Sequence, residues 1–295
     1  MSSTTSFAAR RSAFAARLRQ PGLIAAPGVF DMISARIADT LGFDALYMTG
    51  YGTVASHLGL PDAGIATYGD MVGRVSRIAA GTATPLMADA DTGYGGLLNV
   101  QHTVRGYEAA GAVVIQLEDQ EFPKKCGHML GRKVVPLADM ARKIEVAAAS
   151  RDSRDFLIMA RTDARTMHGL DDALRRAEAY LKAGADILFV ESPETEAEMR
   201  RVGEAFTGVP LLANMVEGGR TPVLSKADLE ALGYKIAIFP GLGFLAIAQT
   251  LKDAYGHLRA TGSSIGAPVK LHDFQAMGAL MGFDEVAAFD AKWRD

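Results

Sequence analysis

The chain has 295 residues, of which 49% are hydrophobic and 22% are charged, and its formal net charge is −3. These values are typical of a soluble globular protein with a large core, and they argue against nucleic acid or an anionic membrane surface as a partner. The single cysteine excludes an internal disulfide, and together with 13 methionines it favours a reducing, cytoplasmic compartment. We therefore expect the ligand to be a small molecule.

The N-terminal segment predicts a helix over residues 6–18. Its arginines and lack of acidic residues are also found in transit peptides, but it contains no apolar core of signal-peptide length. An ordinary helix that packs on the rest of the fold is the favoured interpretation. No stretch of the chain approaches the roughly 18 uninterrupted apolar residues of a membrane span, so we expect no membrane partner.

Short apolar runs alternate with helix-length segments along the chain, as in parallel strands that are buried on both faces. Eight such strands close a barrel, and helical patterns such as residues 170–185 end in glycine before the next strand. The fold class predicted is therefore α/β, a (β/α)8 TIM barrel. The predicted strands are 23–26, 45–50, 85–91, 112–119, 156–163, 186–192, 210–216 and 235–241.

The segment beyond the eighth predicted strand has a different organisation. Residues 243–262 form a long amphipathic pattern, and the sequence "TGSSIGAP" separates it from a final helical pattern over residues 274–283. We expect one barrel domain over residues 1–295 with a helical extension at about residues 263–295. This extension packs outside the barrel, either on the same chain or on another subunit.

Polar residues follow most of the predicted strands, at the end of the barrel where enzymes of this fold carry their catalytic groups. Any one of these residues could instead cap the next helix, but so many at one mouth indicate a functional site. The residues are Tyr47, Thr49, Asp89, Asp91, Glu118, Arg161, Asp163, Glu191, Asn214 and Pro240.

Asp89 and Asp91 stand two residues apart on a predicted strand, so both carboxylates point the same way. They repel each other unless a positive charge lies between them, and hard oxygen ligands suit Mg²⁺ or Mn²⁺. Glu118 on the neighbouring strand could complete the site directly or through water, and Asp62 is a further candidate. The alternative is that these acids serve as helix caps or salt-bridge partners.

The only cysteine, Cys126, is surrounded by Lys124, Lys125 and His128 in the stretch "KKCGH". Nearby positive charge favours the thiolate, so we predict a reactive thiol that can donate and accept a proton. The alternative is an inert buried cysteine, and a zinc site lacks the necessary ligands. Gly127 and Gly131 would allow this loop to close over the site and exclude water.

The remaining residues at the mouth suit a carboxylate substrate. Arg161 could hold a carboxylate in bidentate fashion, and backbone amides around Gly50 and Tyr51 could bind another anionic oxygen. Asn214 and Glu191 could bind a hydroxyl group or orient the arginine.

Tyr47 lies on the same strand face as Thr49 and could act as a base if a metal and nearby cations lowered its pKa from about 10. A ring that simply packs in the barrel is the alternative for Tyr47. His128 and Lys124 would compensate negative charge on the reacting groups.

The stretches "KKCGH", "DADTGYG", "LEDQ" and "YMTGYG" together resemble the isocitrate lyase and phosphoenolpyruvate mutase superfamily over about residues 20–260. The resemblance implies a Mg²⁺-dependent barrel, a mobile loop that carries the cysteine, and tetramers whose last helix is exchanged between paired subunits. The cysteine in "KKCGH" is typical of the branch that cleaves carbon–carbon bonds, whereas the phosphonate mutases lack it.

Within this branch, "CGHMLGRKVVP" and "ANMVEGGRTP" resemble the lyases that act on alkylmalates, with the methylisocitrate lyases close behind. Leu245 stands where the tricarboxylate-cleaving enzymes have an arginine, and Pro240 stands where the oxaloacetate hydrolases have a serine. The resemblance therefore implies cleavage of a 2-hydroxy dicarboxylate to pyruvate and a short carboxylate. Alternatives are a methylisocitrate lyase, an oxaloacetate decarboxylase or hydrolase, and a metal-binding barrel without catalysis.

Overall fold

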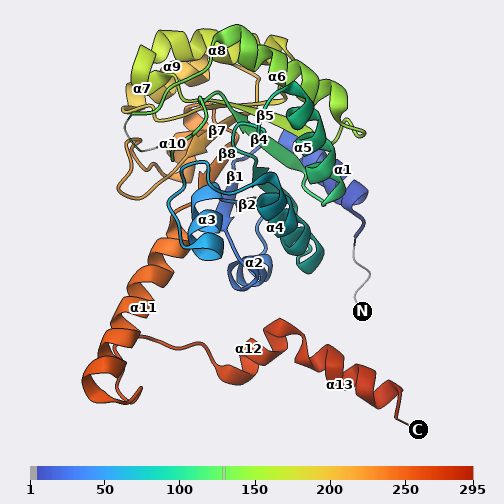
Figure 1. Ribbon diagram of the computed structural model, residues 1–295, viewed down its shortest axis with the longest axis vertical. Helices are drawn as coiled ribbons and strands as arrows, with labels where there is room; N and C mark the ends of the chain where they lie inside the picture. Colours follow the sequence, from blue (N-terminus) through green and yellow to red (C-terminus); the bar gives the residue numbers. More distant parts are fainter. Residues whose placement is uncertain (1–4, 128, 130, 295) are drawn as a thin grey trace. The chain divides into compact units, whose positions relative to one another are not determined.

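The computed structural model describes residues 5–294 except residues 128 and 130 (Figure 1). The described chain forms two compact units, residues 5–242 and residues 243–294. The first unit contains all the strands and the candidate site, and the second contains the helices at the C-terminal end.

The first unit is a closed barrel of eight parallel strands in sequential order, β1 to β8 (Figure 1). This confirms the predicted (β/α)8 fold, and each strand lies in or overlaps one of the apolar runs found in the sequence. Parallel pairing places the carboxyl ends of all strands at one mouth. The strands are β1 Ile24–Val29, β2 Leu46–Met48, β3 Leu86–Asp89, β4 Val114–Glu118, β5 Leu157–Thr162, β6 Ile187–Val190, β7 Leu211–Asn214 and β8 Ile236–Phe239.

Two layers of apolar side chains explain why the strand sequences are almost uniformly hydrophobic. One cluster, with members such as Met87, Met159 and Phe189, comes mainly from the strand residues of the barrel, and Phe14 of the N-terminal helix α1 (Phe7–Arg19) belongs to it. The larger cluster contains strand residues that alternate with those of the first cluster, such as Leu188 beside Phe189, together with residues on the inner faces of the surrounding helices. A strand buried on both faces needs apolar residues at consecutive positions.

Helices follow the strands around the barrel, and their starts and ends follow local sequence signals. The first, α1, begins after Ser6, whose side chain accepts a hydrogen bond from the backbone of Ala9, which confirms the predicted N-terminal helix. The helices are α1 Phe7–Arg19, α2 Met32–Asp39, α3 Gly50–Leu58, α4 Tyr68–Gly81, α5 Leu97–Ala109, α6 Leu137–Ser150, α7 Arg165–His168, α8 Leu170–Lys182, α9 Glu196–Ala205 and α10 Lys226–Ala231.

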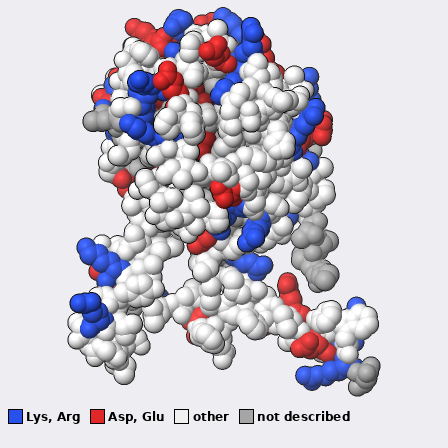
Figure 2. All heavy atoms as spheres, in the orientation of Figure 1, with Lys and Arg blue, Asp and Glu red and all other residues white. Residues whose placement is uncertain are grey.

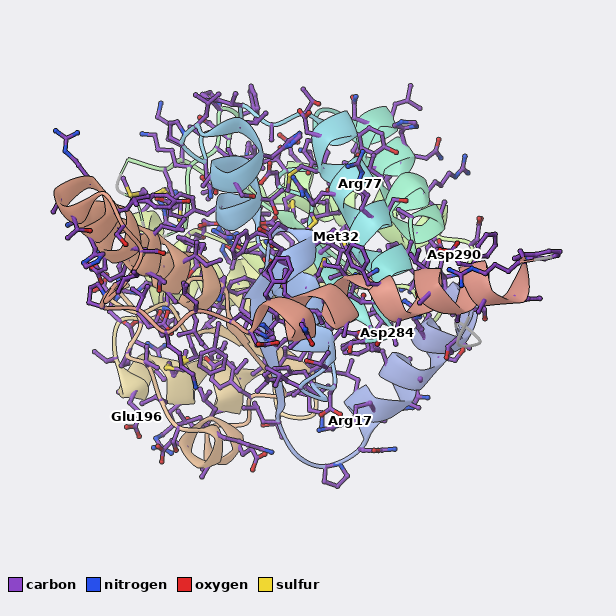
Figure 3. All side chains as sticks on the ribbon, turned by 90° about the horizontal axis from the view of Figure 1, so that it is seen from below. Arg17, Met32, Arg77, Glu196, Asp284 and Asp290 are labelled. Carbon is purple, nitrogen blue, oxygen red and sulfur yellow. The ribbon has the colours of Figure 1, made fainter. Side chains whose placement is uncertain are left out.

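The second unit contains most of α11 (Leu242–Thr261), together with α12 (Phe274–Met281) and α13 (Phe283–Lys292). The first two match the predicted helical segments, and Gly282 in the left-handed region (φ 95°) separates α12 from α13. Asp284 lies in the first turn of α13, where a carboxylate interacts favourably with the helix dipole (Figure 3). None of the described residues of these three helices is buried.

Within the part of the chain that the structure describes, no helix combines the length and apolar character needed to cross a membrane. In the view of Figure 2, basic and acidic side chains are interspersed over the surface and no continuous basic stripe is visible.

Candidate active site

The carboxyl ends of adjacent strands bring the predicted site residues together at the barrel mouth. The register pairs Glu118, the last residue of β4, with Arg161 near the end of β5. Asp89 ends β3 and Asn214 ends β7, while Glu191 directly follows β6. The acidic and basic residues of this group are almost completely buried. Their proximity follows from the parallel barrel, as the sequence predicted.

Arg161 is held by three carboxylates. Its Nη1 lies 3.2 Å from Glu118 Oε2, and its Nη2 lies 2.8 Å from Asp163 Oδ1 and 3.5 Å from Glu191 Oε2. Nε donates a second hydrogen bond to Asp163 over 2.9 Å, so the bidentate partner of this guanidinium is Asp163. Burial opposes the charge, but the three carboxylates outweigh it and raise the pKa of Arg161. Arg161 is therefore a rigid, permanently charged group at the centre of the mouth.

Lys124, from the loop that follows β4, reaches into the acidic group. Its Nζ lies 2.6 Å from Asp62 Oδ1 and 2.5 Å from Asp91 Oδ1. Burial alone would lower the pKa of Lys124, but Asp91, Glu118 and the other nearby carboxylates raise it well above its ordinary value. The amine thus bridges two of the predicted metal-binding carboxylates.

Asp89 is linked to Tyr47 through a glutamine that the sequence analysis did not single out. Gln116 Nε2 donates to Asp89 Oδ1 over 3.1 Å, and Gln116 Oε1 accepts from the Tyr47 hydroxyl over 2.8 Å. Burial, followed by the nearby Asp89 charge, raises the pKa of Tyr47 well above its ordinary value. The tyrosine is therefore a protonated donor in this arrangement, and its predicted role as a base requires additional positive charge.

The beginning of α3 lies directly beside the Asp89 carboxylate. A Cβ atom at Gly50 would lie 2.6 Å from Asp89 Oδ2, so only glycine allows this approach. Thr49 is the N-cap residue of α3 and is buried, but its side chain does not cap the helix. The first amides of a helix attract anions, which fits the predicted role of the Gly50 and Tyr51 backbone in binding a carboxylate oxygen.

The loop that carries Cys126 passes over the same mouth. Its neighbour Gly127 is so close to Arg161 that an added Cβ would lie 2.3 Å from Nη2 and 2.7 Å from Glu191 Oε2. Ser192 Oγ lies 3.2 Å from the Gly127 carbonyl oxygen. Cys126 itself is half-buried. The predicted catalytic residue His128 lies outside the described residues.

The remaining predicted residues also line this end of the barrel. Asn214 Nδ2 donates to Glu191 Oε2 over 3.0 Å, so the pair forms one polar unit beside Arg161. Pro240 follows β8 and lies against β1, where a Cβ on Gly28 would be 2.5 Å from the Pro240 Cα. The functional roles of all these residues stay predictions.

Several buried polar residues support the site without having been predicted as members. Asp119 accepts hydrogen bonds from Thr162, Tyr180 and the backbone of Asp163, which fixes the segment after Arg161. The sequence does contain a signal for Gln116. It is the only polar residue of β4 before Glu118, and it lies two positions before Glu118 and therefore on the same face of the strand. Ser192, Asp119 and Arg132 carry no comparable signal.

The residues at the mouth fit a divalent cation. In the described part of this cluster, six carboxylates face three cations, which leaves negative charge uncompensated. Burial raises the pKa of Asp91 to about 7 even beside Lys124, and Glu118 Oε1 is buried without a hydrogen-bond partner. The carboxylates are Asp62, Asp89, Asp91, Glu118, Asp163 and Glu191, and the cations are Lys124, Arg132 and Arg161.

Among the described residues, no three side chains form a preformed cage for a metal ion. Mg²⁺ does not need one, because it usually binds one or two carboxylates and keeps several waters or substrate oxygens. Asp89 and Asp91, with Glu118 and Asp62 nearby, are therefore a suitable set for Mg²⁺ or Mn²⁺ bound partly through water.

Similar proteins point to the same chemistry. Over 264 residues the chain is 50% identical to the 2,3-dimethylmalate lyase of Eubacterium barkeri, an alignment that spans 90% of this chain and 91% of that protein. It is 38% identical over 270 residues to the 2-methylisocitrate lyase of Bacillus subtilis, which spans 92% of this chain and 87% of that protein.

Solved structures agree with this result. A 2,3-dimethylmalate lyase matches with a TM-score of 0.90 and 36% identity, over 96% of this chain and 95% of that chain. An oxaloacetate acetylhydrolase in complex with an inhibitor matches with a TM-score of 0.91 and 34% identity, over 96% of both chains. A phosphonopyruvate hydrolase, solved in complex with oxalate and Mg²⁺, matches with a TM-score of 0.86 and 28% identity, over 96% of this chain and 99% of that chain.

The phosphoenolpyruvate phosphomutase family model matches residues 14–259, which include the whole barrel from β1 to β8 and every residue of the cluster at its mouth. The chain therefore belongs to the phosphoenolpyruvate phosphomutase family, in the superfamily that also includes the isocitrate lyases.

Proposed function

We propose that this chain is a Mg²⁺-dependent carbon–carbon lyase that cleaves a 2-hydroxy dicarboxylate of the alkylmalate type, such as 2,3-dimethylmalate, to pyruvate and a short carboxylate such as propionate. The observation that carries the proposal is the position of the Cys126 loop. Gly127, the next residue, lies against Arg161, and Lys124 reaches the Asp62 and Asp91 carboxylates. The loop that carries the thiol thus lies beside the arginine and the acidic group at the barrel mouth, which supports a reaction that uses all three.

The reaction needs a proton acceptor at one end of the bond and a proton donor at the other. The hydroxyl proton of the substrate passes to a base, for which Tyr47 is the candidate. As the O–H electrons form the carbonyl of pyruvate, the bond between C2 and C3 breaks and its electron pair stays on C3. The Cys126 thiol then protonates C3, which gives propionate from 2,3-dimethylmalate and leaves a thiolate.

The other residues bind and orient the substrate. Arg161, His128 and Lys124 offset the negative charge of the departing carboxylate, and the amides of Gly50 and Tyr51 hold a carboxylate oxygen. Asp89 and Asp91, with Glu118 and Asp62, would hold Mg²⁺, which supplies positive charge for the oxygens of the hydroxy acid. Asn214 and Glu191 orient the substrate hydroxyl, and Thr49 and Pro240 shape the pocket.

A substrate panel tests the proposal. Release of pyruvate is measured with 2,3-dimethylmalate, 2-methylisocitrate and oxaloacetate as separate substrates, in the presence of Mg²⁺, and the second product is identified by mass spectrometry. We expect the highest kcat/KM with the alkylmalate. If the purified protein does not cleave 2,3-dimethylmalate faster than a control reaction without protein, the proposed substrate class is wrong.

A 2-methylisocitrate lyase is the second candidate, and the 38% identity to the Bacillus subtilis enzyme favours it. That substrate carries one more carboxylate and needs one more cationic partner. Leu245, at the position that we align with the arginine of those enzymes, offers an apolar side chain instead. Higher kcat/KM for 2-methylisocitrate than for the alkylmalate would select this alternative.

We also infer a homotetramer in which the C-terminal helices contact another subunit. Helices α11 to α13 expose many large apolar side chains, including Tyr255, Phe274, Phe289 and Trp293. Such surfaces are typical of subunit interfaces. Light scattering coupled to size-exclusion chromatography measures the mass directly, and a monomeric mass would contradict the inference. The single cysteine remains our reason to expect a cytoplasmic enzyme.

A further inference from the structure

The loop that carries the thiol is held at both of its ends by buried cations. On the N-terminal side, Lys124 pairs with Asp62 and Asp91. On the C-terminal side, Arg132 is buried, although its neighbours Gly131 and Lys133 are exposed. Burial of a guanidinium group costs free energy unless the charge is paired. The residues that pair with Arg132 therefore indicate the role of this side chain.

Arg132 is paired with the same carboxylate that holds Arg161. Its Nη1 contacts Asp163 Oδ1, and its Nη2 donates to Thr166 Oγ1 over 2.7 Å. Asp163 Oδ1 is also the atom that lies 2.8 Å from Arg161 Nη2. One carboxylate oxygen therefore joins a loop residue to the central arginine of the site.

Gly127 is a second loop residue that contacts Arg161. Its backbone lies against Arg161 and Glu191 so closely that no side chain would fit, and its carbonyl oxygen faces Ser192 Oγ. Two described residues of the loop, Gly127 next to Cys126 and Arg132, therefore meet the same Arg161–Asp163 pair. Loss of the Arg132 side chain would therefore release this part of the loop from Asp163, while Asp163 and Glu118 continue to hold Arg161.

We propose that Arg132 is a positioning residue: its contacts with Asp163 and Thr166 act as a latch that holds the loop beside Arg161 and thereby positions the Cys126 thiol for the reaction. Its importance for turnover depends on the proposed lyase function, but its effect on the loop does not. Arginine suits this role because its planar fork contacts Asp163 and Thr166 at once, whereas lysine offers a single point of charge.

Alkylation of the thiol tests the latch without any assay of activity. Cys126 is the only cysteine, so the mass of the intact protein reports its modification by iodoacetamide. The alkylation rate is measured at increasing pH until it no longer rises, because at this plateau the thiol is fully ionised and the rate reports only its accessibility. The proteins compared are the wild type, Arg132→Met, Arg132→Lys and the matched control Lys133→Met.

We expect the plateau rate to rise about tenfold in Arg132→Met and less in Arg132→Lys, and to stay unchanged in Lys133→Met. Circular dichroism verifies that each variant is folded. If Arg132→Met does not fold, Arg132→Lys decides the question in its place. A plateau rate equal to that of the wild type in a folded Arg132 variant would overturn the proposal.

Steady-state kinetics with 2,3-dimethylmalate give the second readout. We expect kcat/KM to fall by about 10- to 100-fold in Arg132→Met with the Mg²⁺ concentration for half-maximal activity unchanged, and to be partly restored in Arg132→Lys. Absence of lyase activity in the wild type would refute the proposed function. The role of Arg132 in holding the loop would then be tested by the alkylation rates alone. Normal kcat/KM in a folded Arg132→Met enzyme would refute the positioning role.

Discussion

Gly127 offers a test of the idea that the thiol loop must close directly onto Arg161. Replacement by alanine adds one methyl group at a position 2.3 Å from Arg161 Nη2 and 2.7 Å from Glu191 Oε2. Nonbonded heavy atoms in contact lie about 3.5 Å apart, so either the loop or the arginine must move by about 1 Å. Arg161 is fixed by Asp163 and Glu118, so we expect the loop to move.

The size of the effect follows from this displacement. A shift of about 1 Å in a catalytic group costs on the order of 10²-fold in rate, so kcat/KM of Gly127→Ala should fall by about 100-fold. The free energy of unfolding should change by less than about 1 kcal/mol, because the φ angle of Gly127 is not among the positive ones and alanine also restricts the unfolded chain.

The assay is pyruvate release from 2,3-dimethylmalate, combined with urea unfolding of the same preparations. Gly73→Ala is the matched control, because an added Cβ there meets no atom within 4 Å and lies in α4, where alanine is favoured over glycine by up to about 1 kcal/mol. The control should keep its kcat/KM and gain stability. Wild-type kcat/KM in Gly127→Ala would refute the close contact between the loop and Arg161.

Three further predictions concern the thiol, the metal and the surface charges. Cys126→Ser should retain its fold and Mg²⁺ binding by calorimetry but lose most turnover; near-normal turnover would exclude the thiol as the proton donor. EDTA should abolish pyruvate release and Mg²⁺ should restore it, whereas activity that survives chelation would remove Asp89 and Asp91 from the mechanism. Glu198→Gln should destabilise the protein by about 1 kcal/mol at neutral pH, because hydrogen bonds from Arg165 lower the pKa of Glu198 in the folded state. The stabilisation by the Glu198 carboxylate is complete above its pKa in the unfolded chain, about 4.3, and is lost as the pH falls through its lower pKa in the folded protein. If the wild type stays more stable than Glu198→Gln in strong acid, this explanation is wrong.

Much of the site follows from sequence patterns alone. Parallel strands bring Asp89, Glu118 and Arg161 to the same mouth, as predicted. The predicted position of Asp91 on the same strand as Asp89 is wrong, because β3 ends at Asp89 and Asp91 lies beyond it with a φ of 49°. The strands themselves were visible because each is buried on both faces and is therefore almost continuously apolar. These inferences depend only on local geometry and on the closure of the barrel.

Other features depended on how the loops fold back over the barrel. The sequence showed Lys124 beside Cys126, but the structure places its amine between Asp62 and Asp91. Likewise, residues far apart in the chain are joined by the Arg132–Asp163 pair and by the Tyr47–Gln116–Asp89 chain.

The amino-acid sequence by itself determined the barrel, the order of its strands and the set of chemical groups at its mouth, because periodicity and burial act over a few neighbouring residues. The tertiary structure decided which carboxylate each buried cation meets. That choice depends on the path of irregular loops and on the competition between desolvation and ion pairing, and neither can be derived from the spacing of residues along the chain.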